Sequence, residues 1–362
     1  MQILLFVTGL AFLIVGAELL VRSASKLASA IGIPSLIVGL TVVAFGTSAP
    51  ELAVSLKAAF TGQANIGVGN VVGSNIFNVL FILGLSALIC PLVVSKQLIR
   101  FDVPLMIVAS VLAFVLAWDH QLSRLDGGLL FLGLILYTGI LIYSSRKTTN
   151  DSESTTALIE KPTKHTVITH VAVIVCGVVL LVIGSRWLVD SAVKFADYMG
   201  VDKLVVGLTI VAAGTSLPEV VTSIVASLRG ERDIAVGNVV GSNLFNLLGV
   251  LGLSALVAPS AIDVSPAVLS FDLPLMIAVA FACLPIFFTG GVISRWEGGF
   301  LFTYYLVYTT YLILIATDHQ ALPVFNTAIL YFALPITVVT IAVTMGQAFR
   351  RKLPPDEGLK PE

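Results

Sequence analysis

The sequence predicts an all-α polytopic membrane protein: two inverted five-helix repeats with helices broken at the membrane midplane, followed by an eleventh, C-terminal helix. Three observations predict this fold class. Of the 362 residues, 57% are hydrophobic and 11% are charged, whereas soluble domains contain about 25% charged residues. The mean hydropathy of +1.02 requires many bilayer-length segments rather than one anchor. Two long motifs also occur twice in the chain.

Apolar segments of about 20 residues, the length of a membrane-spanning helix, recur along the whole chain. They predict eleven spans, at 3–21, 34–59, 66–90, 103–118, 127–144, 167–189, 203–228, 234–257, 273–289, 298–316 and 325–348. The first segment lacks the basic residues that precede the apolar core of a secretory signal. We therefore interpret it as a span.

The basic residues are distributed unequally between the two sides that these spans define. About 15 of the 20 Lys and Arg residues fall on the side of segments 22–33, 91–102, 145–166, 229–233, 290–297 and the C-terminus. This side is expected to be cytoplasmic, which puts the N-terminus outside a cytoplasmic membrane and the C-terminus inside. The net charge of −1 and the scarcity of basic clusters exclude nucleic acid as a partner.

The chain contains an internal repeat. Val38 to Glu51 align with Val206 to Glu219, and Gly69 to Asn78 align with Gly237 to Asn246, both at an offset of 168 residues. Each copy has five predicted spans, and because five is odd, the second copy enters the membrane from the opposite face. We predict a first repeat at 1–144, a cytoplasmic linker at 145–166, an inverted second repeat at 167–318, and an extra transmembrane helix with a cytoplasmic tail at 319–362.

Each repeat carries one acidic residue deep inside a predicted span, Glu51 in the first copy and Glu219 in the second. A carboxylate at this depth costs on the order of 3 kcal/mol. Neither repeat supplies a Lys or Arg at a matching mid-span position. The two acids must therefore be protonated or bind a cation. The alternative is that each is a hydrogen-bonded glutamic acid that holds helices together.

A proline precedes each of these acids. Pro50 has no N–H to donate to the carbonyl four residues earlier, so the helix is expected to break at Gly46-Thr47-Ser48 and to release main-chain carbonyls. The acid then falls in the first turn of the resumed helix, where the positive end of the helix dipole offsets part of the cost of ionisation. The second copy has the same arrangement around Pro218.

Polar side chains spaced four residues apart form a stripe on the next helix of each copy, at Asn70, Ser74, Asn78 and at Asn238, Ser242, Asn246. Gly69 and Gly73 beside the first stripe predict a close helix contact. Asn75 and Asn243 lie about 100 degrees off the stripe and rank below it. The broken helices and the stripes can surround one midplane cavity, although interhelical hydrogen bonding alone is the other explanation of the Asn and Ser residues.

A site made of oxygens, with no thiol or imidazole, suits a hard cation. Calcium takes about 6 to 8 oxygens in flexible geometry, so calcium is the predicted ion, with magnesium or another divalent cation as the alternative. With Asn78 and Asn246 neutral, the formal charge of the site is near −2, which one calcium ion or two sodium ions neutralise. The expected partners are these transported ions and the lipid bilayer, with no resident cofactor, and the sequence does not define an oligomeric state.

At these residues the sequence resembles the cation/calcium exchanger superfamily, specifically the prokaryotic sodium/calcium exchangers, whose two repeats carry Gly-Thr-Ser-x-Pro-Glu and Gly-Ser-Asn-x-Phe-Asn/Asp. The resemblance implies exchange of sodium for calcium by alternating access, with residues 1–28 and 168–195 sliding against a fixed core. It implies that Glu51 and Glu219 bind calcium with help from the Thr47 and Thr215 carbonyls. It implies sodium sites completed by Ala44, Ser48, Ser74, Asn78, Ala212, Ser216, Ser242 and Asn246.

Two other functions stay open. A calcium/proton antiporter of the same superfamily would share the site and differ in the coupling ion, although the Ser48/Ser216 and Asn78/Asn246 lining favours sodium. An intramembrane hydrolase also uses two carboxylates, but such aspartyl proteases use Asp in a Gly-Asp motif, whereas the acids here are Glu. The chain is therefore predicted to be a transporter and not an enzyme.

Overall fold

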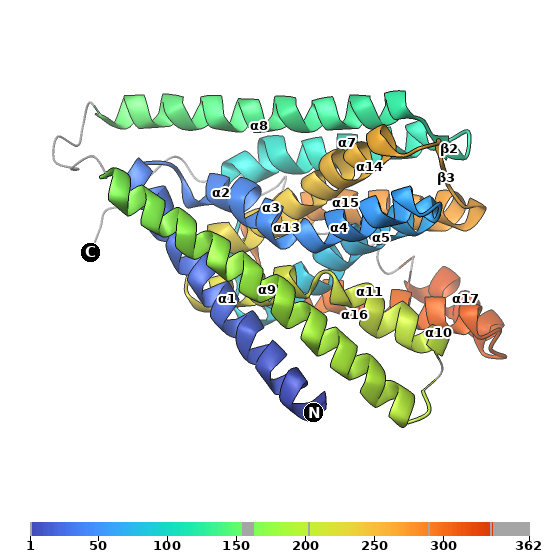
Figure 1. The fold of residues 1–362 in the computed structure, drawn as a ribbon. Helices are drawn as coiled ribbons and strands as arrows, with labels where there is room; N and C mark the ends of the chain where they lie inside the picture. Colours follow the sequence, from blue (N-terminus) through green and yellow to red (C-terminus); the bar gives the residue numbers. More distant parts are fainter. Residues whose placement is uncertain (1, 154–162, 202, 289, 334, 336–362) are drawn as a thin grey trace.

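The computed structural model describes residues 2–153, 163–201, 203–288, 290–333 and 335, which form a bundle of helices (Figure 1). The first copy of the repeat contains α1 (Gln2–Ile31), α2 (Ser35–Val38), η1 (Gly39–Val43), α3 (Ala44–Thr47), α4 (Ala49–Phe60), α5 (Ala64–Phe77), η2 (Asn78–Leu83), α6 (Gly84–Ile89), η3 (Leu98–Asp102), α7 (Val103–Leu116) and α8 (Arg124–Glu153), where η marks a π-helical segment.

The second copy repeats this order, and a short helical segment follows it. It contains α9 (Lys164–Tyr198), α10 (Lys203–Val206), η4 (Gly207–Val211), α11 (Ala212–Gly214), α12 (Leu217–Leu228), α13 (Arg232–Leu244), η5 (Phe245–Leu251), α14 (Gly252–Val257), η6 (Val268–Asp272), α15 (Leu273–Phe288) and α16 (Arg295–Ala316), followed by α17 (Leu322–Ala328) and η7 (Ile329–Ala333).

The multi-span helical fold predicted from the sequence is confirmed. Within the described residues, eight helices are long and apolar enough to cross a membrane, and the pair Ser35–Thr47 and Ala49–Phe60, bent by 46°, makes a ninth span. The predicted span at 203–228 is present as α10 to α12, which are separately too short to count. The predicted eleventh span, 325–348, begins in α17 and η7, and its residues 334 and 336–348 lie outside the described part of the chain.

α1 is longer than the predicted span at 3–21 and includes most of the predicted loop at 22–33. It continues to Ile31 and ends at Gly32, whose φ of 72° terminates the helix. Glu18 forms ion pairs with Arg22 and with Arg229, which lies in the turn between α12 and α13. The charged residues at the predicted end of this helix are therefore paired, Arg22 within the helix and Glu18 also with the other repeat.

The predicted linker at 145–166 is also partly helical. α8 continues to Glu153 and α9 begins at Lys164, capped by the Thr163 hydroxyl, which accepts a hydrogen bond from the Thr166 N–H. Residues 154–162 lie outside the described part of the chain. The division into domains at this linker stays a prediction.

The equivalent helices α1 and α9 pack against each other in opposite directions (Figure 1). A Cβ atom added at Gly9 would lie 2.8 Å from the Gly184 carbonyl oxygen, and one added at Gly16 would lie 2.7 Å from the Gly177 carbonyl oxygen. Gly9 lies beside Gly184 and Gly16 lies beside Gly177, so the two helices are antiparallel. This pair of equivalent helices is thus oppositely directed, which is consistent with the inverted repeat that the odd number of spans predicts.

Two short antiparallel strand pairs, which the sequence analysis did not predict, join the copies. β1 (Leu92–Val93) pairs with β4 (Val292–Ile293), and β2 (Gln121–Leu122) pairs with β3 (Ile262–Asp263). β1 follows α6 and β4 follows α15, whereas β2 follows α7 and β3 follows α14, so exchanging the two copies converts one pair into the other. Each pair joins two loops that the predicted topology assigns to one side of the membrane, which supports the predicted grouping of the loops.

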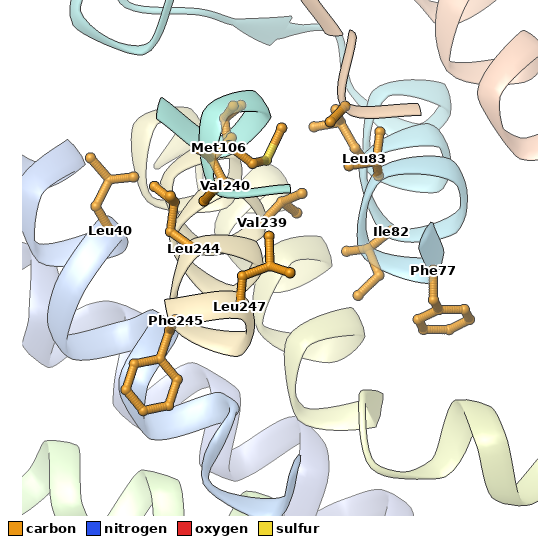
Figure 2. Close-up of a cluster of buried hydrophobic side chains, with 14 of the residues drawn as sticks. Leu40, Phe77, Ile82, Leu83, Met106, Val239, Val240, Leu244, Phe245 and Leu247 are labelled. Carbon is orange, nitrogen blue, oxygen red and sulfur yellow. The ribbon is translucent and has the colours of Figure 1, made fainter. Parts of the chain in front are cut away.

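The core lies around α13. Every residue from Ile234 to Leu244 is buried, and α13 packs against η1 and α7. Figure 2 shows Val240 and Leu244 of this helix in one apolar cluster with Leu40 and Met106. By contrast, α1, α8, α9 and α16 leave many large apolar side chains exposed, as lipid-facing helices do. The midplane residues therefore lie inside a protein shell.

The glycine contacts between α1 and α9 give a stability prediction. Gly16→Ala is expected to lower the free energy of unfolding by roughly 1–3 kcal/mol, because the new methyl group would overlap the Gly177 carbonyl oxygen. Thermal unfolding of the purified protein in detergent measures this. Gly139→Ala in α8 is the control, since a Cβ there meets nothing within 4 Å. Equal melting temperatures for the two variants would contradict the close packing of α1 and α9.

Candidate ion-binding site

The helix breaks lie where the prolines predict them. α3 ends at Thr47, Ser48 leaves the helical region with φ −80° and ψ 8°, and α4 begins at Ala49. In the second copy Ser216 has φ −88° and ψ 7°, and α12 begins at Leu217. Both prolines occupy the first turn of the resumed helix, and so do both acids. The local sequence therefore produces the broken helices that the site requires.

The glycine before each break lets α9 approach. A Cβ on Gly214 would lie 2.6 Å from a methyl group of Val189, and one on Gly46 would lie 2.7 Å from a methyl group of Val178. The Gly214 carbonyl, which Pro218 leaves without its helical donor, accepts a hydrogen bond of 2.7 Å from the Ser185 hydroxyl of α9. α9 therefore contacts both breaks directly.

The two acids are brought together by reciprocal hydrogen bonds between the copies. The Ser48 hydroxyl donates to Glu219 Oε1 at 2.9 Å, and the Ser216 hydroxyl donates to Glu51 Oε1 at 2.8 Å. Both carboxyl groups are completely buried. Among the described residues, neither acid forms an ion pair with a Lys or Arg. Two buried carboxyl groups at this point require protons or a bound cation to balance their charge.

The first asparagine of each stripe is occupied by interhelical hydrogen bonds. Asn238 donates to the Ser223 hydroxyl at 3.0 Å, and its Oδ1 lies 3.1 Å from the Thr47 hydroxyl. Asn70 has the equivalent partners: it donates to the Ser55 hydroxyl at 3.1 Å, and its Oδ1 lies 3.4 Å from the Thr215 hydroxyl. Asn70 and Asn238 therefore tie α5 and α13 to the broken helices, which is the structural explanation that the sequence left open for them.

Five buried side-chain oxygens around the breaks have no hydrogen-bond partner among the described residues: Glu51 Oε2, Glu219 Oε2, Asn78 Oδ1, Asn246 Oδ1 and Ser242 Oγ. Buried polar atoms are almost always paired, because an unpaired one loses its hydration without compensation. Four of these five are acceptor oxygens contributed symmetrically by the two copies. Bound cations compensate acceptor oxygens of this kind.

The remaining predicted residues lie nearby but in unequal environments. Ser74 Oγ lies 3.2 Å from Ser216 Oγ. The Ala44 carbonyl accepts from the Ser48 N–H at 3.0 Å and lies 3.3 Å from the Thr47 hydroxyl. Ala44 is buried, whereas its counterpart Ala212 is exposed. The first copy is therefore closed around its break, and the second is not.

The two copies also differ in the space beside the break. A cavity of about 340 Å³ lies between α4, α9 and α11, and its lining includes Thr215, Lys57, Arg186 and Asp190. At the equivalent place in the other copy, α1 packs along α12, and Arg229 Nε donates to Glu18 Oε2 at 3.0 Å. The two copies therefore differ at equivalent places, with a cavity in one and packed helices in the other.

The prediction that Gly69 and Gly73 form a close helix contact is wrong in this structure. A Cβ at either position meets nothing within 4 Å. Their counterparts do form such a contact: a Cβ on Gly241 would lie 2.6 Å from the Leu40 carbonyl oxygen, and one on Gly237 would lie 3.1 Å from that of Leu36. The difference lies in what packs against each helix: α2 and η1 lie against α13, whereas in the other copy α11 meets α5, with the Thr215 hydroxyl 3.4 Å from Asn70 Oδ1.

Asn75 and Asn243, which rank below the stripe in the sequence, join the two repeats in the structure. Asn75 and Asn243 are both buried, and each donates a hydrogen bond to the main-chain carbonyl of the other, at 3.2 Å and 3.4 Å. The signal that could have found them is their presence in both copies of the repeated motif. Their angular distance from the stripe concealed it, because the partner of each belongs to the opposite repeat.

Comparisons with known proteins agree with this architecture. The family model for the sodium/calcium exchanger protein matches residues 1–143 and again residues 169–314. Inner membrane protein YrbG of Escherichia coli is 41% identical over 285 residues, covering 77% of this chain and 87% of its own length. Sodium/calcium exchanger MaX1 of Methanosarcina acetivorans is 34% identical over 346 residues, covering 86% and 98%.

A solved structure gives the same result for the fold. The sodium-calcium exchanger NCX_Mj, soaked with sodium and without calcium, matches with a TM-score of 0.72 at 28% sequence identity, covering 87% of this chain and 98% of its own. The two family matches also correspond to the two copies of the repeat. This chain belongs to the sodium/calcium exchanger family.

Proposed function

We propose that this protein is a secondary active antiporter that exchanges sodium for calcium across a cytoplasmic membrane by alternating access. The observation that carries the proposal is the set of four unpaired buried oxygens, one from each of Glu51, Glu219, Asn78 and Asn246. Membership of the exchanger family supports cation antiport, and MaX1 and NCX_Mj are named as sodium/calcium exchangers.

Calcium is proposed to bind between Glu51 and Glu219, whose free Oε2 atoms would replace part of its water shell. The Thr47 and Thr215 carbonyls would add neutral oxygens. The sodium ions would share the same carboxylates and use oxygens of Ala44, Ser48, Ser74, Asn78, Ala212, Ser216, Ser242 and Asn246. Because sodium and calcium need the same carboxylates, the two ions would exclude each other, which is the requirement for exchange rather than co-transport.

The carboxylates give the first test of this site. Glu51→Gln and Glu219→Gln are each expected to reduce calcium uptake into proteoliposomes to below about one tenth of the wild-type rate, since losing 1.4 kcal/mol of ion binding is already a tenfold change. Asp197→Asn, an exposed carboxyl-to-amide change on α9, is the control. Uptake that stays unchanged in a folded Gln variant would remove the proposed site.

The coupling ion is tested separately. Proteoliposomes loaded with sodium and diluted into sodium-free medium are expected to take up calcium, whereas a proton gradient of equal size without sodium is not. If more than two sodium ions exchange for one calcium ion, the uptake moves net charge and responds to an imposed membrane potential. Calcium uptake driven by protons and indifferent to sodium would instead identify the calcium/proton antiporter.

The hydrolase alternative receives no support from the relatives, which include named exchangers and a putative antiporter, CaxA of Alkalimonas amylolytica, 39% identical over 260 residues, covering 72% of this chain and 82% of its own. The excess of basic residues in one set of loops supports a cytoplasmic C-terminus. With that orientation, the cavity beside Lys57 and Thr215 opens to the outside.

This orientation predicts unequal access to two equivalent residues. In a variant without the native cysteines, Thr215→Cys is expected to react with a membrane-impermeant maleimide added outside, because Thr215 lines the cavity. Thr47→Cys is expected to react at least about tenfold more slowly, because Thr47 is completely buried. The reverse order of reactivity would show that the orientation or the direction of opening is wrong.

A further inference from the structure

Four asparagines form a closed hydrogen-bonded group where the two repeats meet, and we refer to Asn75, Asn78, Asn243 and Asn246 as the asparagine clasp. Asn78 Nδ2 donates to Asn243 Oδ1 at 3.0 Å, and Asn246 Nδ2 donates to Asn75 Oδ1 at 3.2 Å. Asn75 and Asn243 donate in turn to each other's main-chain carbonyls. All four residues are at most 2% exposed.

The pattern fixes which end of each amide faces where. A main-chain carbonyl can only accept, so the end of the Asn243 side chain that meets the Asn75 carbonyl must be the amide nitrogen. Its other end, Oδ1, can only accept, so Asn78 must present its own amide nitrogen to it. The oxygen of Asn78 is then the end left over. In the same way, Asn75 donates to the Asn243 carbonyl and accepts from the Asn246 amide nitrogen, which leaves the Asn246 oxygen free.

The two oxygens selected in this way are those that lack a partner. Asn78 Oδ1 and Asn246 Oδ1 are both buried without a hydrogen bond among the described residues. A flipped amide would present an N–H group in their place, and an N–H group repels a cation. The orientation of these two amides therefore decides whether they can act as ion ligands.

We propose that Asn75 and Asn243 are positioning residues for ion binding: each holds the amide of the ligand residue on the opposite repeat so that its oxygen is presented to the ion. This rests on the proposed exchange of sodium and calcium at the site. Neither residue has a buried side-chain oxygen without a partner among the described residues, so neither is proposed as a ligand. Because each repeat orients the ligand of the other, the two halves of the site are coupled through the clasp.

The alternative is that Asn75 and Asn243 only hold α5 and α13 together. The two explanations differ in what a carboxylate does at the ligand position. An aspartate has oxygen at both ends and needs no orienting, so it removes the dependence on the positioning residue facing it. If Asn75 and Asn243 only hold the helices together, replacing them should weaken ion binding equally, whether the ligand position carries asparagine or aspartate.

The experiment is a set of double variants of the full-length protein purified in detergent. The readout is the concentration of calcium alone, or of sodium alone, that gives half of the maximal thermal stabilisation. Asn243→Leu is expected to raise this concentration at least about tenfold. In the Asn78→Asp background the same change is expected to have less than about a twofold effect.

The matched control places the aspartate at the ligand position that the mutated asparagine does not orient. In the Asn246→Asp background, Asn243→Leu is expected to keep its full effect, because Asn75 and not Asn243 orients position 246. Asn75→Leu should show the opposite pattern, with rescue by Asn246→Asp and not by Asn78→Asp. Met106→Leu controls for packing, since its sulfur lies 3.5 Å from the Asn243 amide but orients no ligand.

An equal loss of ion affinity in the Asn78→Asp and Asn246→Asp backgrounds would overturn the proposal and show that Asn243 only holds the helices together. If Asn243→Leu does not fold, Asn243→Ser gives a milder break, since one hydroxyl cannot replace both ends of the amide, and the mirror set on Asn75 repeats the test. If the wild-type protein is stabilised by neither ion, the proposed function fails; if it is stabilised but the rescue by aspartate is missing, only the positioning role fails.

Discussion

The structure depends on one constraint, which is that two carboxyl groups lie buried in the membrane interior without a cationic side chain. Glu51 and Glu219 are completely buried, and among the described residues no Lys or Arg pairs with them. The features around them follow from this. The broken helices put each acid at the positive end of a half-helix, two serines donate to it from the opposite copy, and the remaining oxygens stay unpaired. Buried carboxyl groups and unpaired acceptor oxygens are what the proposed cation site requires.

Building the site from two copies makes each half depend on the other. Ser48 supplies a donor to Glu219, Ser216 supplies one to Glu51, and the orienting asparagines also act across the interface. A rigid twofold arrangement would nevertheless open to both sides or to neither. The structure avoids this by asymmetry, since α1 closes against α12 while a cavity separates α9 from α4. Equivalent sequences therefore occupy different environments at the same moment.

That asymmetry sets the limit of what the sequence could predict. The breaks at the prolines and the meeting of the two acids were predictable, because chain chemistry and the repeat determine them. The packing of Gly69 and Gly73 was not, because the same motif is tightly packed in the second copy and open in the first. Periodicity along one helix likewise could not show the role of Asn243, whose partners lie on the other repeat. α1 also extends beyond its predicted end at residue 21, and Ser25 in the extension donates a hydrogen bond to Glu231, far along the chain.

The choice of asparagine at positions 78 and 246 connects charge to orientation. An aspartate at either position would present oxygen in any rotamer, but it would add a negative charge to a site that already holds two, and one calcium ion or two sodium ions would no longer neutralise it. An asparagine keeps the charge near −2, but only the oxygen of its amide can accept. Neighbouring residues must therefore hold the amide with its oxygen toward the ion. The asparagine clasp does this with hydrogen bonds anchored on main-chain carbonyls, which cannot reverse their polarity. A neutral ligand set in this fold therefore requires a second layer of residues that a more acidic set does not.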